Sequence, residues 1–265
     1  MNFVCLSDHL RNTWRYRTSF FNFLNQLLWR YAHDLPNWFF PKESVMSFCY
    51  PEPLGNLIFN VRNNASDIFI FEGVFTRQSH NLRLLNEPKT ILDLGANAGF
   101  TTVFFKKRYP MAQVACVEPM PSNLKCLKIN LRLNQIDAEI FPAAIAIKDG
   151  AIMMDVSKRD YSHKVSGINT SLERSMEQLW VPAVTVPTIC NKLGWNSIDF
   201  LKVDIEGYEK ILFSENCSWI KQVKAMCIEW HGNLAEEHLS NLAKKFGFNE
   251  PRHFPGTWLL ERPHT

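Results

Sequence analysis

Acidic residues lie at the ends of four apolar runs in this 265-residue chain, at positions where they could support chemistry. Asp93 precedes a loop that contains two glycines, and Glu118 ends the next apolar run. Asp204 and Glu206 follow a third run, and His231 lies just beyond the acid that ends a fourth. A carboxylate can balance a positive charge or accept both hydroxyls of a ribose, and a carboxylate or an imidazole can take up a proton. These residues are therefore candidates for ligand binding and proton transfer.

Alternating strand and helix patterns from Thr90 onward predict the framework that would bring these residues together. Short, continuous, branched runs are typical of strands buried on both faces of a parallel sheet. Strands are expected at 90–94, 113–117, 138–141, 198–203 and 224–229, with helices at 99–109, 122–134, 187–193, 207–213 and 234–246. The carboxyl ends of parallel strands share one edge of a sheet, so the acids would meet there. The pattern predicts an α/β fold with a doubly wound, mostly parallel sheet.

Three further segments complete the predicted domain. An extra strand pair is expected at 151–156 and 183–186, and the tail from 248 to 260 could form an antiparallel edge pair. The polar stretch between the paired strands has no core pattern, so residues 161–180, together with the aromatic N-terminal region, are expected to select the substrate. A strand at 57–61 and a turn at 63–64 would lead into the sheet.

Residues 1–50 are rich in aromatic side chains and predict a separate, mainly helical segment ahead of a domain at 51–265. Phe20, Phe23, Leu24, Leu27 and Leu28 repeat at helical spacing, so one apolar face is expected. We expect this face to pack on the main domain or to join two copies as a homodimer. Flanking arginines leave contact with a membrane surface as the alternative.

Composition indicates an ordinary globular protein, with 46% hydrophobic and 21% charged residues. A net charge of +3 without a dense basic block argues against nucleic-acid binding. The seven cysteines are scattered and form no CxxC pair, which favours free thiols in a reducing compartment. No signal peptide and no apolar run long enough to span a membrane is evident. The expected location is the cytoplasm, without stable membrane insertion.

The loop after the first predicted strand suits neither a dinucleotide nor a phosphate. Its glycines, Gly95 and Gly99, lack the G-x-G-x-x-G spacing, and no Gly-Lys-Ser/Thr ending follows. Asp93 would repel a phosphate but suits a ligand with positive charge, such as a sulfonium, and Glu118 stands where a carboxylate holds a ribose. An acid, a glycine turn and a second acid together indicate a pocket for S-adenosylmethionine.

The chain resembles the FkbM-type methyltransferases. The resemblance rests on ILDLGANAGFTT, CVEPMPSNLKCLKIN and PAAIAIKDG, and above all on IDFLKVDIEGYEKILF, whose D-x-E-G-x-E element is specific for that group. It runs from about residue 66 to 232 and does not include the first 50 residues. It implies a class I methyltransferase fold, Rossmann-like, with S-adenosylmethionine as methyl donor. It also implies, most often, O-methylation of a sugar or natural-product hydroxyl.

The resemblance and the loop chemistry together assign roles to residues. Asp93 and the Gly95–Gly99 loop would hold the methionine end of the donor, with Asn97 facing its carboxylate. Glu118 would bind the ribose, while Pro119, Met120 and Ala144 would line the adenine. The predicted donor-binding residues are Asp93, Gly95, Ala96, Asn97, Gly99, Glu118, Pro119, Met120, Ser122, Ala144 and Asp204.

Methyl transfer requires positioning of the acceptor and removal of its hydroxyl proton. Asp204 and Glu206 are predicted to act there, because buried acids without a partner are costly, although they could instead start a helix. His231 is a second candidate for the general base. Asp204 and Glu229 could hold a divalent cation, but we predict no metal site.

Other function classes stay open at this point. The acceptor is a small molecule or a peptide, and N-methylation of an amide or amine on a modified peptide is the main alternative. A nicotinamide oxidoreductase would use a similar sheet, but the loop and the D-x-E-G-x-E element favour methyl transfer. A binding module without catalysis is disfavoured by the complete set of acids.

Overall fold

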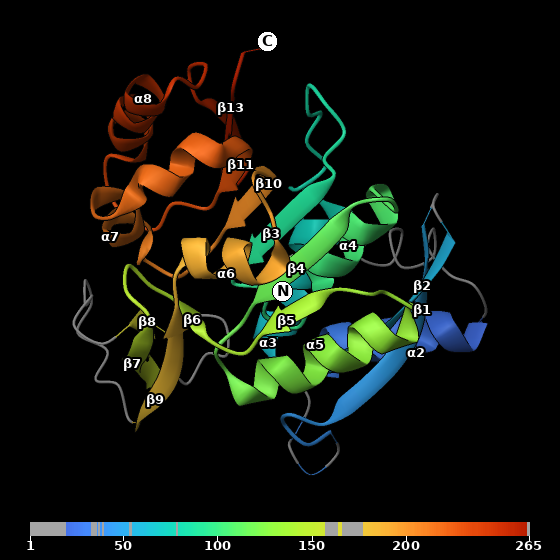
Figure 1. Ribbon diagram of the computed structural model, residues 1–265. Coiled ribbons are helices and arrows are strands. Elements are labelled where there is room, and N and C mark those ends of the chain that lie inside the picture. The colour runs from blue at the N-terminus through green and yellow to red at the C-terminus, as the bar shows by residue number, and fades with distance from the viewer. Residues whose placement is uncertain are drawn as a thin grey trace.

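The structure, a computed structural model, describes residues 20–32, 36, 38, 40–52, 55–77, 79–156, 164–165 and 177–263. These residues form a seven-stranded central sheet, a four-stranded sheet and a two-stranded hairpin. Figure 1 shows the hairpin and helix α2 (Phe20–Ala32) beside helix α5 (Pro121–Leu133), far from helices α7 (Glu209–Ser214) and α8 (Ala235–Phe246).

Five neighbouring strands of the central sheet run parallel. In spatial order they are β11 (Val223–Ile228), β10 (Ile198–Val203), β3 (Thr90–Leu94), β4 (Gln113–Val117) and β5 (Glu139–Phe141). Within these five strands, the chain forms β3 first, adds β4 and β5 on one side of it, and then adds β10 on the other side of β3. The reversal between β3 and β10 is the place where open α/β sheets form a ligand crevice.

The tail forms the antiparallel edge that the sequence predicts. Strand β13 (Thr257–Glu261) pairs antiparallel with β11, and β12 (Arg252–Phe254) pairs antiparallel with β13. The turn between β12 and β13 contains Pro255 and Gly256, and Gly256 has the positive φ of +83° that such a turn favours.

Helices cover the central sheet in two apolar clusters. Helices α4 (Phe100–Arg108) and α5 pack in one cluster with the hairpin, and α6 (Val186–Leu193), α7 and α8 pack in the other. Leu92 and Leu201 of the central strands are fully buried, as continuous apolar strands in a doubly wound sheet should be. A short 3-10 helix, η2 (Cys217–Gln222), leads into β11. The predicted class I, Rossmann-like fold is confirmed.

A second sheet has the strand order β6-β9-β7-β8. Its strands are β6 (Ala144–Ile145), β7 (Gly150–Val156), β8 (Lys164–Val165) and β9 (Glu177–Val184). The predicted strand pair is present as β7 and β9, but its register differs: residues 151–156 pair with 177–182 instead of 183–186, because β9 ends at Val184 and α6 starts at Val186. Much of the predicted substrate-selecting stretch, 161–180, lies outside the described residues.

The hairpin of β1 (Val45–Glu52) and β2 (Gly55–Arg62) has both outer edges covered by amide side chains. Along β1, Asn22 of α2 bonds both the amide and the carbonyl of Cys49, at 2.7 and 2.5 Å. Along β2, Asn130 and Asn134 of α5 bond the backbone of Asn60 and Ile58 in the same way. Strand edges need such partners. The amides therefore attach the hairpin to both helices.

Helix α2 buries a different face from the one that the sequence predicts. Asn22, Gln26, Trp29 and Arg30 are buried, whereas Phe20, Leu24 and Leu28 of the apolar repeat are exposed. The prediction that the apolar face packs on the domain is wrong for these three residues, because the edge of β1 requires hydrogen bonds. Trp29 supplies the apolar anchor: its ring lies 5.2 Å from that of Phe48 and its Nε1 donates to the Arg62 carbonyl.

Strand β1 crosses the predicted boundary at residue 50 and packs in the same cluster as α4. The connection to the central sheet is made by α3 (Ala65–Phe71) and a π-helical turn, η1 (Glu72–Thr76). Division of the chain at residue 50 stays a prediction, as does a homodimer. Among the described residues, no helix is long and apolar enough to cross a bilayer.

Candidate active site

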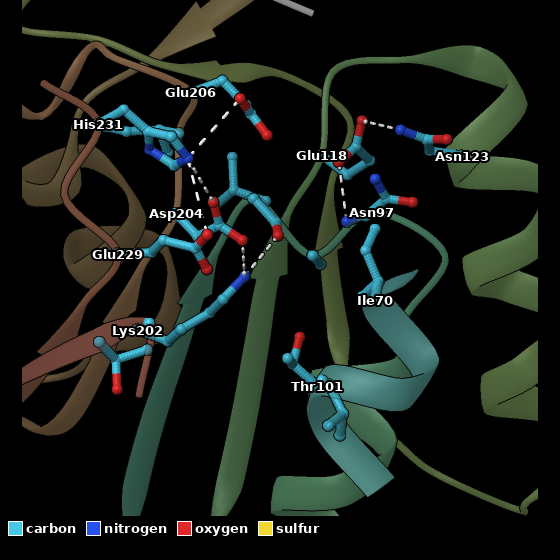
Figure 2. Close-up of a pocket in the computed structure, with 18 of the residues that line it drawn as sticks. Ile70, Asn97, Thr101, Glu118, Asn123, Lys202, Asp204, Glu206, Glu229 and His231 are labelled. Atoms are coloured by element: carbon cyan, nitrogen blue, oxygen red, sulfur yellow. Dashed lines mark hydrogen bonds and ion pairs between the residues drawn. The ribbon is translucent and has the colours of Figure 1, made fainter. Parts of the chain in front are cut away.

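A cavity of about 470 Å³ opens at the carboxyl ends of the central strands. Gly95 follows β3, Glu118 follows β4, Asp204 follows β10 and Glu229 follows β11, and all four line this cavity. Figure 2 shows two groups of polar side chains in it: Glu118 with its amide partners, and the acids around His231. Glu118, Asp204, Glu206 and His231 therefore lie at the same edge of the sheet, as the sequence predicts.

The glycine loop after β3 is held by backbone bonds to the neighbouring strand. The amides of Gly95 and Ala96 both donate to the Val117 carbonyl at 3.0 Å. Gly95 has a φ of +81° and Asn97 a φ of +48°, a conformation that glycine and asparagine tolerate best. Gly95, Ala96 and Asn97 line the cavity, whereas Gly99 begins α4 and packs against Leu127.

Glu118 accepts three hydrogen bonds at the side of the cavity next to the glycine loop. Its Oε2 accepts from the Asn97 amide at 2.9 Å, and its Oε1 accepts from the Met120 amide at 2.9 Å and from Asn123 Nδ2 at 3.1 Å. Burial raises the pKa of Glu118, and these three donors oppose that effect. Two carboxylate oxygens offer about four acceptor positions, so one is left for a ligand hydroxyl.

Beside Glu118 the wall becomes apolar. Pro119, Met120 and Ala144, which are predicted to line the adenine of a donor, line the cavity; their contact with adenine stays a prediction. Ser122 is exposed and does not lie on this wall. Helix α5 starts at Pro121 with Met120 as its N-cap, so Ser122 points away while Asn123, one residue later, faces Glu118. The assignment of Ser122 to the pocket is wrong, because the helix begins one residue earlier than predicted.

Asp93 does not line the cavity. It is fully buried, its Oδ2 accepts from the hydroxyls of Thr101 and Thr102 at 2.7 Å, and its Oδ1 lies 3.3 Å from Lys202 Nζ. The expectation that this acid balances a cationic ligand is wrong, because Lys202 already balances its charge.

Lys202 was missed by sequence reasoning, although a lysine inside the apolar run of β10 is itself a signal, since a buried charge needs partners. Its Nζ donates to the Gly95 carbonyl at 2.7 Å and lies 3.3 Å from Asp204 Oδ2. Burial lowers the pKa of Lys202, but Asp93 and Asp204 outweigh burial and raise it. Lys202 therefore ties the donor loop to the acid that follows β10.

Four acids surround His231. Its Nε2 lies 4.0 Å from Asp204, 3.8 Å from Glu206 and 3.8 Å from Glu229, and its Nδ1 lies 3.0 Å from Glu209 Oε1. Figure 2 shows Asp204, Glu206 and Glu229 on the side of the ring that faces the cavity. Glu209 thus holds the imidazole at Nδ1, while Nε2 faces the other three carboxylates.

Glu209, which sequence reasoning also missed, explains the local backbone. Its Oε1 accepts from the amides of Ile205 and Gly207 at 3.2 Å, and Glu206 between them has a φ of +55°. Helix α7 begins at Glu209 with Tyr208 as its N-cap. Asp204 and Glu206 therefore do not cap this helix, and that alternative to a functional role does not hold.

The pKa values decide which group of this cluster can take up a proton. Burial lowers the pKa of His231, but the Glu209 hydrogen bond and the nearby acids outweigh burial and raise the pKa to about 9. Burial, followed by repulsion from Asp204, raises the pKa of Glu229 to about 7. A pKa raised to about 9 favours the imidazolium form of His231 at neutral pH, and that form has no lone pair to accept a proton. The carboxylates are better suited to that role.

The cluster also has a spacing that could admit a cation. One ligand atom from each of Asp204, Glu206 and His231 lies within 4.8 Å of the others. The absence of a metal therefore stays a prediction.

His80, on the segment before β3, lines the cavity without having been predicted. Its Nδ1 lies 2.9 Å from Ser79 Oγ. Burial, with a smaller contribution from Lys202, lowers the pKa of His80 to about 4. It therefore adds a neutral imidazole to the wall.

Comparison with known proteins bears on this site. A family profile described as "Methyltransferase FkbM domain" matches residues 93–249, which is more than half of the chain. The chain belongs to the FkbM methyltransferase family. The matched region of this FkbM protein contains Glu118, Lys202, Asp204 and His231, but not the hairpin or α3.

Two curated relatives are similar to this FkbM protein. "Methyltransferase sdnD" of Sordaria araneosa is 26% identical over 143 residues, which are 52% of this chain and 52% of the relative. "Methyltransferase 1" of Beauveria bassiana is 20% identical over 158 residues, 53% of this chain and 64% of the relative. The chain thus covers less than two thirds of either relative. The crystal structure of methyltransferase FkbM from Methylobacillus flagellatus KT is 14% identical in sequence and aligns with a TM-score of 0.48. The alignment covers 96% of this chain and 58% of the Methylobacillus chain.

Proposed function

We propose that this chain transfers a methyl group from S-adenosylmethionine to a hydroxyl of a small-molecule or peptide acceptor. A sugar or natural-product hydroxyl fits the family best. The observation that carries the proposal is the joining of two chemistries in one cavity. A buried carboxylate suited to a ribose lies at one side, and a group of carboxylates suited to a hydroxyl proton lies at the other.

The residues of the cavity fit this donor. Glu118 keeps an acceptor position for a ribose hydroxyl, and Pro119, Met120 and Ala144 supply an apolar surface for a base. The volume of about 470 Å³ is in the range of small-molecule sites. Asn97 would serve the methionine end, because its Oδ1 already accepts from the Ala98 amide and its amide nitrogen is left to donate.

When bound, S-adenosylmethionine supplies an electrophilic methyl group on a sulfonium. The protein must orient the acceptor and remove its proton. We assign proton removal to Glu229, whose pKa of about 7 matches a general base at neutral pH, and orientation to Asp204. His231, as an imidazolium, would keep the neighbouring acids from repelling one another and from excluding the acceptor.

Calorimetry tests the donor. We expect S-adenosylhomocysteine to bind and NADH not to bind. Glu118→Gln should weaken binding of S-adenosylhomocysteine by about 1.5–3 kcal/mol, the scale for hydrogen bonds to charged groups. Exposed Ser122→Ala is the matched control and should leave the affinity unchanged. Binding of NADH but not of S-adenosylhomocysteine would overturn the proposal. Turnover with sugar, polyketide and peptide acceptors, followed by mass spectrometry, then separates O- from N-methylation.

A further inference from the structure

A buried arginine of the N-terminal hairpin reaches the donor side of the cavity. Arg62, the last residue of β2, is 4% exposed, and its side chain bonds Asp67 of α3 through Nε and Nη2, the shortest contact being 2.6 Å. Asp67 is fully buried and also accepts from the Arg62 amide at 2.8 Å. The charge of the arginine is therefore balanced inside the hairpin layer, and its other donors are directed elsewhere.

Those donors contact two amide side chains of the cavity. Arg62 Nη1 donates to Asn123 Oδ1 at 2.9 Å, and Nη2 donates to Asn97 Oδ1 at 3.4 Å. A guanidinium has donors only, so it accepts no contact from an amide NH₂. Each asparagine must therefore turn its oxygen toward Arg62 and its nitrogen away.

The consequence for Asn123 is visible at Glu118. Because Oδ1 faces Arg62, Nδ2 faces Glu118 and donates to Oε1 at 3.1 Å (Figure 2). In the opposite orientation the amide oxygen would meet the carboxylate and repel it. For Asn97, the Arg62 contact acts together with the Ala98 amide, which donates to the same Oδ1 at 2.7 Å, and both leave the amide nitrogen for a ligand in the cavity that Asn97 lines.

From this arrangement we propose that Arg62 is a positioning residue for donor binding, acting through Asn123 and Asn97. The inference rests on the proposed function, because it concerns the same donor. It also extends the site beyond residues 93–249, since Arg62 and Asp67 precede the region shared by the family. The hairpin is thus part of the binding site as well as of the core.

Two substitutions test the connection without removing the Arg62–Asp67 charge balance. Arg62→Lys keeps the charge but loses the fork of donors that reaches both asparagines. Asn123→Asp keeps an oxygen for Arg62 but places a second oxygen where Glu118 needs a donor. Each variant should raise the Kd for S-adenosylhomocysteine by about tenfold or more. The donor KM should rise as well, while kcat at saturating donor stays within about twofold of wild type.

A double variant separates positioning from general weakening. If Arg62 acts through Asn123, then Arg62→Lys combined with Asn123→Ala should bind no more than about threefold worse than the weaker binder of the two single variants Arg62→Lys and Asn123→Ala. Arg30→Lys is the matched control, because Arg30 forms a partly buried ion pair with Glu72 in the same layer and does not line the cavity. It should lower the melting temperature yet leave the Kd unchanged.

Several results would overturn the inference. Wild-type affinity in either Arg62→Lys or Asn123→Asp would do so, as would fully multiplicative losses in the double variant. An equal loss in Arg30→Lys would show that damage to the layer, rather than the amide contacts, weakens binding. If Arg62→Lys does not fold, wild-type affinity in Asn123→Asp still overturns the inference, because the contact between Asn123 and Glu118 that Arg62 is proposed to orient would then not matter for binding. Wild-type protein that does not bind S-adenosylhomocysteine would instead refute the proposed function, and the inference with it.

Discussion

Substitution of Gly95 should reveal how closely the donor loop approaches the acid-bearing strand. A Cβ atom added at Gly95 would lie 1.8 Å from the backbone oxygen of Asp204, whereas real Cβ contacts are at least 3.0 Å. The loop or the end of β10 must therefore move by at least about 1.2 Å to accept alanine. Neither can move freely, because Lys202 bonds the Gly95 carbonyl and the Asp204 amide donates to Leu94.

The expected cost has two parts. The φ of +81° at Gly95 disfavours any side chain by about 1–2 kcal/mol. Forcing the backbone contact apart adds about 1–3 kcal/mol, the usual cost of overpacking. Gly194→Ala isolates the first part, since Gly194 has a φ of +67° and an added Cβ would meet nothing within 4 Å.

Urea denaturation and calorimetry measure the two effects together. Gly95→Ala should lower the free energy of unfolding by about 2–5 kcal/mol, and it should weaken binding of S-adenosylhomocysteine, because Ala96 and Asn97 move with the loop. Gly194→Ala should cost only about 1–2 kcal/mol and leave binding unchanged. The argument fails if Gly95→Ala is no more destabilising than Gly194→Ala and binds the ligand as wild type does.

Three further expectations concern the charges of the site. kcat/KM should rise with pH through about 7, as Glu229 loses its proton, and fall through about 9, as the His231 imidazolium is lost. Glu229→Gln should lower kcat/KM by about 10²–10⁴ and abolish the rise near pH 7, and an unchanged rise would exclude Glu229 as the base. Lys202→Met should lower the free energy of unfolding, measured by urea denaturation, by about 3–5 kcal/mol, because the buried Asp93 loses its ion pair. Adding Asp93→Asn to this variant should restore part of the lost free energy. Dialysis against EDTA should leave turnover unchanged, because the His231 imidazolium and Lys202 already supply positive charge to the acids. Activity that is lost on dialysis and restored by magnesium would contradict this prediction.

Much of the central sheet could be predicted from the sequence, because burial on both faces makes its strands continuous apolar runs. The strands at 90–94, 113–117 and 198–203 have the predicted bounds, and the antiparallel edge at Pro255-Gly256 is present. The position of Glu118, Asp204 and His231 followed from the same rule, since Glu118 and Asp204 come directly after such a strand, His231 comes three residues after one, and parallel strands end at one edge.

The sequence could not determine which charged groups partner one another. Asp93 and Glu118 both come from apolar runs, but Asp93 is neutralised by Lys202 from a strand more than 100 residues away, and Glu118 faces the cavity. The same holds for His231: its pKa depends on Glu209, Asp204 and Glu206, which only the packing of β10, α7 and β11 brings within reach.

The N-terminal layer shows the limit of periodicity most clearly. The apolar repeat of α2 correctly predicts a helix, yet the structure buries Asn22 and Gln26 and exposes Phe20 and Leu24. Sequence periodicity reports which side chains are apolar, whereas burial here is decided by the unpaired backbone of β1, whose edge needs hydrogen-bond partners. A strand edge exists only once the chain has folded, so the need it creates cannot be seen in the sequence of the helix that meets it.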